Sequence, residues 1–370
     1  MLELADIFRA AGPAYRQAYA PRMLPSHRAA LRDLEACRTA ACGGHLCACD
    51  HCGERRYRYH SCRNRHCPKC HADQTRRWLD QQRARLLPCP YFLVTFTLPA
   101  ELRALARSHQ KRVYGLLMSA AAQALLKLTA DPQHLGARPG LLAVLHTWTR
   151  ALLYHPHVHL LVTAGGWSEG LDPRWVPARR PAFLLPGWAL SVVFRAKFRD
   201  ALRKAGLLDQ APATVWTRDW VVHLQHAGNG DQVLDYLARY VFRIALVNSR
   251  LEHFENGRVT FRFRDGRTGK TRRCTLDALS FIARFLQHVL PRGFSKVRYY
   301  GLFSPSRKPL LEQARAQLVA LPTSPPRPAP VATDLAASDV AVEPVTPRCP
   351  FCGIGALQVI QTLPRWRPPP

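Results

Sequence analysis

Two pairs of side chains have the spacing that metal-assisted phosphate chemistry needs. His157 and His159 stand two apart in an apolar run, so a β-strand would turn both imidazoles to one face, where they could bind one divalent metal ion. Tyr236 and Tyr240 stand four apart, so a helix would place both phenols on one side. Because a metal can polarise a phosphate that a tyrosine attacks, these pairs predict an enzyme that cuts DNA and stays covalently attached to it. Packing of the tyrosines in a hydrophobic core is the alternative interpretation of their spacing.

The predicted metal site needs more than two histidines. Mg²⁺ and Mn²⁺ are hard ions that prefer oxygen ligands, so two imidazoles would leave either ion under-coordinated. We therefore expect a third protein ligand, for which Gln225, Asp231 and Asp235 are the candidates near the tyrosines. His155 precedes the expected strand, and we expect it to be a hydrogen-bonding neighbour of the metal ligands or of DNA.

Clustered cysteines predict zinc. Nine of the twelve cysteines fall between Cys37 and Cys89, and thiols in a chain without an export signal should stay reduced. Two CxxC pairs can supply four thiolates to one tetrahedral zinc ion: Cys49, Cys52, Cys67 and Cys70. Four further ligands could form a second zinc site: Cys37, His45, Cys62 and His66. Cys42 or Cys47 could replace one of these, and the alternative is a single zinc ion with the remaining thiols buried.

A third CxxC pair, Cys349 and Cys352, stands apart from the others. The stretch 321–347 before it is rich in Pro, Ala, Ser and Thr, which is typical of a flexible linker. Two thiols without a partner pair are half of a zinc site. The C-terminal segment is therefore expected to be a disordered tail.

The charge of the chain predicts a polyanionic partner. Lys and Arg number 53 against 25 Asp and Glu, a net charge of +28, with a pI near 10.5. Nucleic acid is the commonest partner of so basic a protein. Basic residues in the zinc segment and beside the tyrosines are the candidate DNA contacts: Arg63, Arg65, Lys69, Arg239 and Arg243. A zinc module with a purely structural role is the alternative.

The elements that must position these residues follow from periodicity and turn residues. Strands are expected over 91–98, 141–145, 158–163, 258–264, 270–275 and 296–300. Helices are expected over 1–36, 76–87, 101–129, 191–204, 231–247 and 278–289. No apolar run reaches the roughly 18 residues that cross a bilayer, and the N-terminus lacks a signal-peptide pattern. We therefore expect no membrane partner.

Several motifs occur together in the order of one known family. They are Cys62–Cys70, Val94–Pro99, His146–Trp148, His155–His159, Phe183–Pro186, Tyr236–Arg243 and Gln287–Phe294. In these motifs, which cover roughly residues 20 to 305, the chain resembles the rolling-circle HUH transposases of the insertion-sequence 91 family.

The resemblance implies an α+β fold, with an HUH-nuclease-like antiparallel sheet flanked by helices behind a small Cys-rich zinc-binding domain. The expected division is 1–90 for the N-terminal helix and zinc domain, 91–305 for the nuclease, 306–347 for a linker and 348–370 for the tail. It also implies that His157 and His159 bind catalytic Mg²⁺ or Mn²⁺, that zinc is structural, and that Tyr236 and Tyr240 are the nucleophiles.

The function implied is single-strand DNA cleavage and strand transfer through a 5′-phosphotyrosine intermediate. The expected partners are single-stranded ends of the protein's own mobile element, with host replication factors as further candidates, in the cytoplasm at a bacterial nucleoid. Two alternatives remain at this point. One is a plasmid replication initiator or relaxase that uses the same chemistry, and the other is a catalytically inactive zinc-containing DNA-binding protein.

Overall fold

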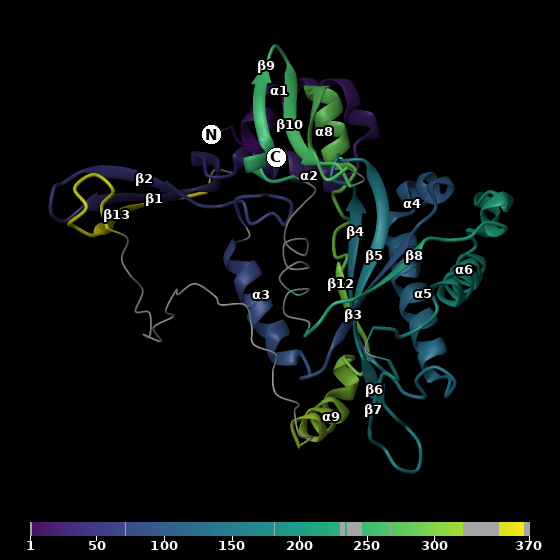
Figure 1. Ribbon diagram of the computed structural model, residues 1–370. Helices are drawn as coiled ribbons and strands as arrows, with labels where there is room; N and C mark the ends of the chain where they lie inside the picture. Colours follow the sequence, from purple (N-terminus) through teal and green to yellow (C-terminus); the bar gives the residue numbers. More distant parts are fainter. Residues whose placement is uncertain are drawn as a thin grey trace.

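The computed structural model of the chain has a central body, a smaller module above it and a projecting arm (Figure 1). It describes residues 2–70, 72–180, 182–229, 234, 246–266, 268–320 and 348–365. Helices and antiparallel sheets are both present, so the predicted α+β class is confirmed. The helix predicted over 231–247 lies almost entirely outside the described residues.

The central body is built on an antiparallel sheet. Among the described residues it has five strands, in the order β12 (Val297–Gly301), β4 (Gly140–Trp148), β5 (Tyr154–Thr163), β3 (Tyr91–Thr97) and β8 (Val222–His226). The strands predicted around residues 91–98, 141–145, 158–163 and 296–300 are all found here. Every residue of β4 is buried, as expected for an inner strand that is covered on both faces.

Helices cover one face of this sheet. They are α4 (Arg103–Ser108), α5 (Gln110–Ala130) and α6 (Gly187–Lys204), which lie to the right of the sheet in Figure 1. Phe96 of β3 and Phe194 of α6 meet edge to face, with ring centroids 4.8 Å apart. Helix α5 is long and apolar enough to cross a membrane, contrary to the expectation that no run is, but its apolar side chains fill the core against the sheet. A buried core helix passes the same test.

The opposite face of the sheet is covered only in part by described elements. Its lower half packs against α3 (Ala72–Arg85) and α9 (Lys308–Ala320), with the small pair β6 (Gly165–Trp167) and β7 (Trp175–Pro177) below. The upper half of this face carries histidines instead of apolar side chains, because His157 and His159 continue the row that begins with Leu161.

The smaller module packs the N-terminal helices against residues 246–289 in one core. Helices α1 (Leu4–Tyr19) and α2 (Pro25–Ala36) pack with α8 (Ala278–Leu286) and with a sheet of β9 (Leu251–Glu255), β10 (Arg258–Arg264) and β11 (Thr271–Asp277). Phe8 of α1 and Phe285 of α8 meet edge to face, with ring centroids 5.2 Å apart. The predicted basic hairpin over 258–275 is confirmed as β10 and β11.

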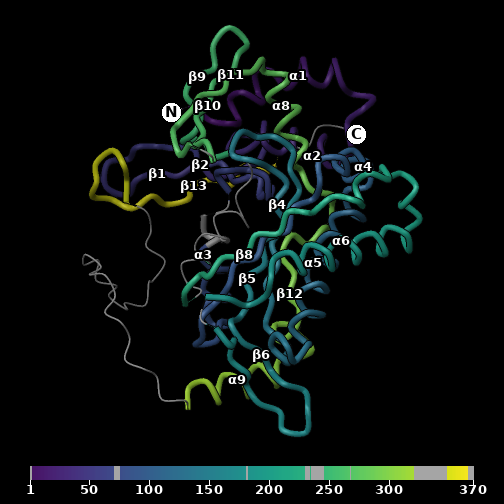
Figure 2. Tube along the Cα trace, turned by 45° about the vertical axis from the view of Figure 1, so that its right-hand side comes forward, coloured from purple at the N-terminus to yellow at the C-terminus, as the bar shows by residue number. Residues whose placement is uncertain are grey.

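The arm extends sideways from this module in both views (Figures 1 and 2). It consists of β1 (Gly44–Cys49) and β2 (Arg55–Tyr59), with β13 (Leu357–Leu363) paired antiparallel to the other edge of β1. The prediction of a disordered C-terminal tail is therefore wrong for residues 348–365. Pairing with β1 gives this segment the backbone partners that it could not supply by itself.

Candidate active site and zinc clusters

Three histidines converge on the upper half of the central sheet. His157 and His159 lie on β5, and His146 lies on β4 directly opposite His157. Each offers a ring nitrogen, and these nitrogens all lie within 4.8 Å of one another. The ring centroids are 4.4 Å apart for His146 and His159, 5.1 Å for His146 and His157, and 4.9 Å for His157 and His159. Such spacing allows one metal ion to be bound by all three imidazoles.

Hydrogen bonds at Nδ1 orient two of these rings. The Nδ1 of His157 donates to the backbone carbonyl of His155 over 2.7 Å. The Nδ1 of His159 is 2.9 Å from the Thr95 hydroxyl, which comes from the neighbouring position on β3. Both contacts engage Nδ1, so Nε2 is the ring nitrogen that can ligate a metal. The predicted role of His155 as a hydrogen-bonding neighbour agrees with this geometry, and its own Nδ1 lies 2.8 Å from the Arg103 guanidinium.

Burial keeps the three imidazoles neutral. Loss of hydration lowers the pKa of His157 to about 4 and that of His159 to about 3, and it holds the pKa of His146 well below its usual range. Only a neutral imidazole has a lone pair to give to a metal. The site is therefore in its ligand form at neutral pH without any rearrangement.

His146 is a third candidate ligand at this site, and sequence reasoning missed it. Of the three candidates, Gln225 lies exposed on β8 opposite Leu93, and Asp231 and Asp235 lie outside the described residues. The sequence signal was present, because His146 interrupts a strand that is otherwise apolar except for Thr147, and it lies in one of the motifs of the resemblance. Only the register between β4 and β5 places it beside the other two.

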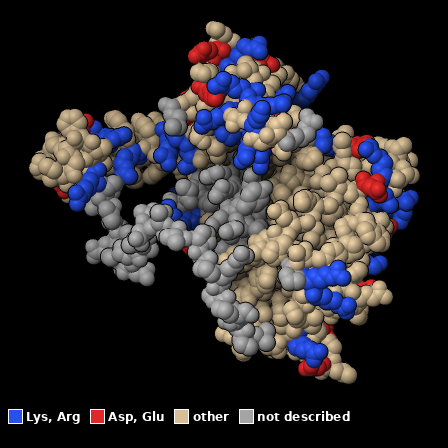
Figure 3. Space-filling model, viewed as in Figure 1, with Lys and Arg blue, Asp and Glu red and all other residues tan. Residues whose placement is uncertain are grey.

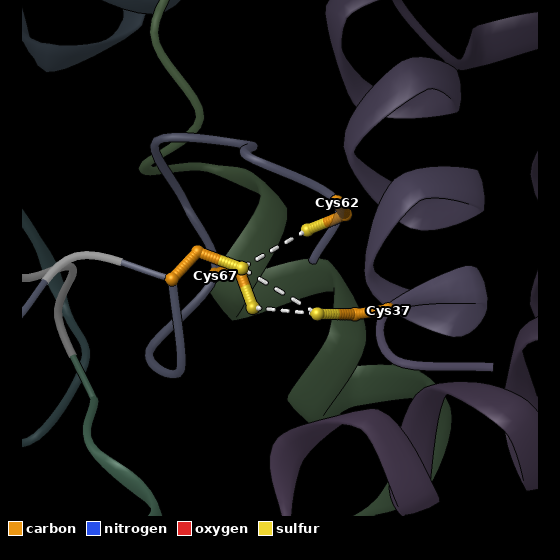
Figure 4. A group of neighbouring side chains, drawn as sticks. Cys37, Cys62 and Cys67 are labelled. Atoms are coloured by element: carbon orange, nitrogen blue, oxygen red, sulfur yellow. Dashed lines mark hydrogen bonds between the residues drawn. The ribbon is translucent and has the colours of Figure 1, made fainter. Parts of the chain in front are cut away.

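The cysteines form two clusters with a different membership from the predicted one. The base cluster consists of Cys37, Cys62, Cys67 and Cys70, at the root of the arm. Its thiols all lie within 4.8 Å of one another, and three of the pairs are 3.5 to 3.6 Å apart. Figure 4 shows Cys37, Cys62 and Cys67 pointing toward one another, with Cys37 at the end of α2. Hydrogen bonding to the Cys62 thiol lowers the pKa of Cys37 to about 7, which favours the thiolate that metals bind.

Cys49 and Cys52 do not join Cys67 and Cys70 as predicted. The hairpin of β1 and β2 carries Cys49 and Cys52 to its far turn, whereas Cys67 and Cys70 stay at its root. Their neighbours are instead Cys349 and Cys352, and these four thiols form the tip cluster.

The two histidines of the predicted second zinc set lie outside both clusters. The ring of His45 packs on that of His60, with centroids 4.8 Å apart, and the Nε2 of His66 accepts from the Leu290 amide over 3.3 Å. Cys42 donates to the Ala36 carbonyl, and neither it nor Cys47 belongs to a cluster. The two other members of that predicted set, Cys37 and Cys62, are in the base cluster.

Comparison with known proteins decides the family. Residues 140–309 match the family described as "Putative transposase", and residues 7–98 match the "Transposase zinc-binding domain" of IS91 elements. A protein of Sinorhizobium fredii named "Putative transposase y4qJ" is 43% identical over 334 residues, which are 85% of this chain and 83% of the relative. The chain belongs to the IS91 family of transposases. The transposase for insertion sequence element IS801 from Pseudomonas savastanoi pv. phaseolicola is 30% identical over 311 residues, 74% of this chain and 71% of the relative. No solved structure matches the transposase.

The family places DNA and zinc among the partners of this transposase. Residues 7–98, which match the zinc-binding domain, contain the whole base cluster and both histidine candidates of the predicted second site. The match to the transposase family contains His146, His157 and His159 together. Tyr236 and Tyr240 fall within the same match but lie outside the described residues, as do Arg239 and Arg243.

The basic residues predicted in the zinc segment of the transposase differ in their contacts. Arg65 donates to the carbonyls of Leu290, Pro291 and Phe294, and burial lowers its pKa. Lys69 pairs with Glu3. These two side chains therefore tie the zinc module to other parts of the protein. Arg63 is exposed and has a positive φ of 54°, on the loop between Cys62 and Cys67 of the base cluster.

On the face shown in Figure 3, exposed positive charge gathers on the module and the arm, with further groups on the right-hand side of the central body. Figure 3 shows Lys and Arg gathered over the part that carries β9 and β10 and along the arm. On β2, Arg55, Arg56 and Arg58 are exposed, and the exposed ring of Tyr57 stacks with that of Tyr59 at a centroid distance of 5.8 Å. Guanidinium groups beside aromatic faces suit phosphates and unpaired bases.

Proposed function

We propose that the transposase cleaves and joins single DNA strands through a 5′-phosphotyrosine intermediate. The observation that carries the proposal is the three-histidine centre on the central strands of an antiparallel sheet, with oriented and neutral imidazoles. Tyr236 and Tyr240 are proposed as the nucleophiles, because they stand at helical spacing in the same family match. In this reaction a tyrosine oxygen forms a bond to phosphorus, and the bond from phosphorus to the 3′-oxygen breaks.

The balance of the step explains strand transfer. The tyrosine gives up its proton, the departing 3′-oxygen takes one up, and the DNA leaves with a free 3′-OH. Attack of a 3′-OH on the phosphotyrosine reverses the same bonds, so joining needs no added energy source. A second tyrosine allows a second cleavage before the first link is resolved.

The histidine centre is proposed to hold the divalent metal of this reaction. His146, His157 and His159 would be its ligands, and their nitrogen donors suit Mn²⁺ better than the harder Mg²⁺. When bound, the metal would supply positive charge to a non-bridging oxygen of the scissile phosphate. Thr95 and His155 hold the rings so that little reorganisation is needed when the metal and the phosphate bind.

The zinc-binding module and the arm are proposed to bind the DNA. Arg63, Arg56 and Arg58 are exposed and can contact phosphates, and the stacked Tyr57 and Tyr59 can receive a base. The proposed substrates are single-stranded ends of the element that encodes the protein, and a free 3′-OH would offer a primer end to host replication factors. Such a reaction takes place where the DNA is, in the bacterial cytoplasm. The transposase family favours transposition over the replication initiator and the relaxase.

Replacing both tyrosines tests the proposal. Tyr236→Phe with Tyr240→Phe should abolish the covalent protein–DNA adduct on a denaturing gel and leave the Kd for the same strand within about twofold, because only the attacking oxygens are lost. Tyr19→Phe on α1 is the matched control and should leave the adduct unchanged. An adduct that persists in the double variant would remove both tyrosines from the mechanism.

A further inference from the structure

The tip cluster joins residues from the two ends of the chain. Cys49 ends β1 and Cys52 lies in the turn after it, and Cys349 and Cys352 lie in the turn before β13. The Sγ atoms of Cys49 and Cys352 are 3.7 Å apart, and those of Cys52 and Cys349 are 3.8 Å apart. A tetrahedron with Zn–S bonds of about 2.3 Å has S···S edges of about 3.8 Å. Disulfide sulfurs would be about 2.05 Å apart, so these thiols are spaced for a shared metal and not for a covalent bridge.

The two turns have the same local structure. Each has the sequence Cys-x-x-Cys-Gly, and the glycine has a positive φ, +71° at Gly53 and +70° at Gly353. In each turn the glycine amide donates to the carbonyl of the first cysteine, over 3.1 Å at Cys49 and 2.8 Å at Cys349. Glycine adopts this conformation without strain, and the turn directs both thiols to the same side.

Amide groups also point at the sulfurs. The Cys52 amide donates to the Cys49 sulfur, and the Gly355 amide donates to the Cys352 sulfur, both over 3.5 Å. Such contacts stabilise a thiolate over a thiol. A Cβ at Gly355 would lie 2.5 Å from the Cys49 sulfur, so the chain passes the cluster too closely for any side chain there.

Backbone pairing brings the two turns together. The register of β1 and β13 runs from Gly44 opposite Leu363 to Cys49 opposite Leu357, which ends at the cluster. Asp50, in the first turn, accepts the Ala356 amide over 2.8 Å. The ladder and this contact place the second turn directly against the first.

The tip has almost no hydrophobic core of its own. In the described part of the chain, the only buried side chain that packs at the tip besides the cysteines is that of Leu357. Phe351 and Ile354 are 78% and 66% exposed. So little apolar burial does not hold a three-stranded unit together, and small units of this kind depend on metal binding.

We propose that Cys49, Cys52, Cys349 and Cys352 bind a zinc ion, separate from the base cluster, that fastens the C-terminal segment to the N-terminal arm. Four thiolates in a closed tetrahedron select a soft or borderline ion such as Zn²⁺ over Mg²⁺ or Ca²⁺, and they leave no open position for catalysis. The site is structural. It stiffens the arm and so fixes the positions of the exposed arginines of β2.

Zinc counting on the purified full-length protein tests this site. Cys349→Ser with Cys352→Ser should lower the zinc content by one ion per chain relative to the unchanged protein, measured by elemental analysis after dialysis. Cys89→Ser with Cys274→Ser is the matched control, because neither residue belongs to a cluster, and it should lose none. An unchanged zinc content in the first variant would overturn the proposal. So would the finding that the metal lost from that variant is iron and not zinc.

A second measurement keeps all four cysteines and so avoids any folding defect of the serine variant. A specific-protease site is inserted into the stretch 321–347, and the protein is cut after purification. The C-terminal fragment should co-elute with the rest on gel filtration and separate after treatment with a zinc chelator. Separation before chelation, or co-elution that persists after complete removal of zinc, would contradict the proposal that zinc holds the C-terminal segment on the arm.

Discussion

Replacing His146 should weaken metal binding at the candidate active site by at least 100-fold. The side chain is 2% exposed, and its ring lies 4.4 Å from that of His159 and 5.1 Å from that of His157, so it completes a three-nitrogen set. Contacts that only orient a ligand are worth about 10- to 100-fold in metal affinity. Loss of the ligand itself should cost no less than the upper end of that range, or about 2.7 kcal/mol at 1.36 kcal/mol per tenfold.

The assay is a Mn²⁺ titration of His146→Asn. Calorimetry measures the binding, and a denaturing gel measures the amount of protein–DNA adduct at each metal concentration. Asn fills part of the space of the imidazole, which limits the cavity in this buried strand. An unchanged zinc content and a melting temperature near that of the unchanged protein would show that the fold persists. Gln225→Ala is the matched control, since Gln225 is exposed on β8, and it should bind Mn²⁺ as before. Equal Mn²⁺ affinity in His146→Asn, or a loss confined to Gln225→Ala, would refute the three-histidine site.

Three further outcomes are expected. Thr95→Val removes the hydrogen bond at His159 Nδ1 while keeping the shape of the side chain. The same titration should therefore show a 10- to 100-fold loss of Mn²⁺ affinity. No loss would show that metal binding does not depend on this hydrogen bond. Arg56→Ala with Arg58→Ala should weaken the binding of single strands of any sequence, as measured by fluorescence anisotropy. The slope of the log of the binding constant against the log of the salt concentration should become shallower by about 1.4, and an unchanged slope would exclude these residues from phosphate contact. Burial lowers the pKa of His288 to about 4. As pH falls from about 6.5 to 4, the unfolded state therefore takes up a proton that the folded state does not, and the free energy of unfolding should fall by up to about 3 kcal/mol. His288→Gln should flatten that part of the profile of melting temperature against pH, and a profile identical to that of the unchanged protein would contradict this explanation.

Runs of apolar and β-forming residues within single strands were enough to predict the central elements. This local pattern indicated β3, β4 and β5, and its alternation placed His157 and His159 on one face. It could not indicate that His146 lies opposite His157, because register is set by packing and by the turn between strands, neither of which is written in one strand's own pattern.

Spacing was a poor guide to which cysteines belong together. The predicted zinc set joined the CxxC pairs that are nearest in sequence, but a hairpin separates them, and the partner of Cys49 and Cys52 lies about 300 residues away. A CxxC motif reports two ligands on one turn and nothing about the other two. The C-terminal pair, interpreted as half of a site, supplied the missing half.

In the proposed mechanism, a tyrosine of this transposase becomes linked to a 5′-phosphate of DNA with a divalent metal present. The most direct measurement uses one single-stranded oligonucleotide from the end of the element, labelled at its 3′ end in one sample and at its 5′ end in another. With Mn²⁺, the 3′ label should move with the protein on a denaturing gel, and the 5′ label should appear on a shorter free strand. Mass spectrometry should then find the linked nucleotide on the peptide that contains Tyr236 or Tyr240. A protein-linked 5′ label, or cleavage by Mn²⁺-loaded protein with no linked product, would contradict the proposed mechanism.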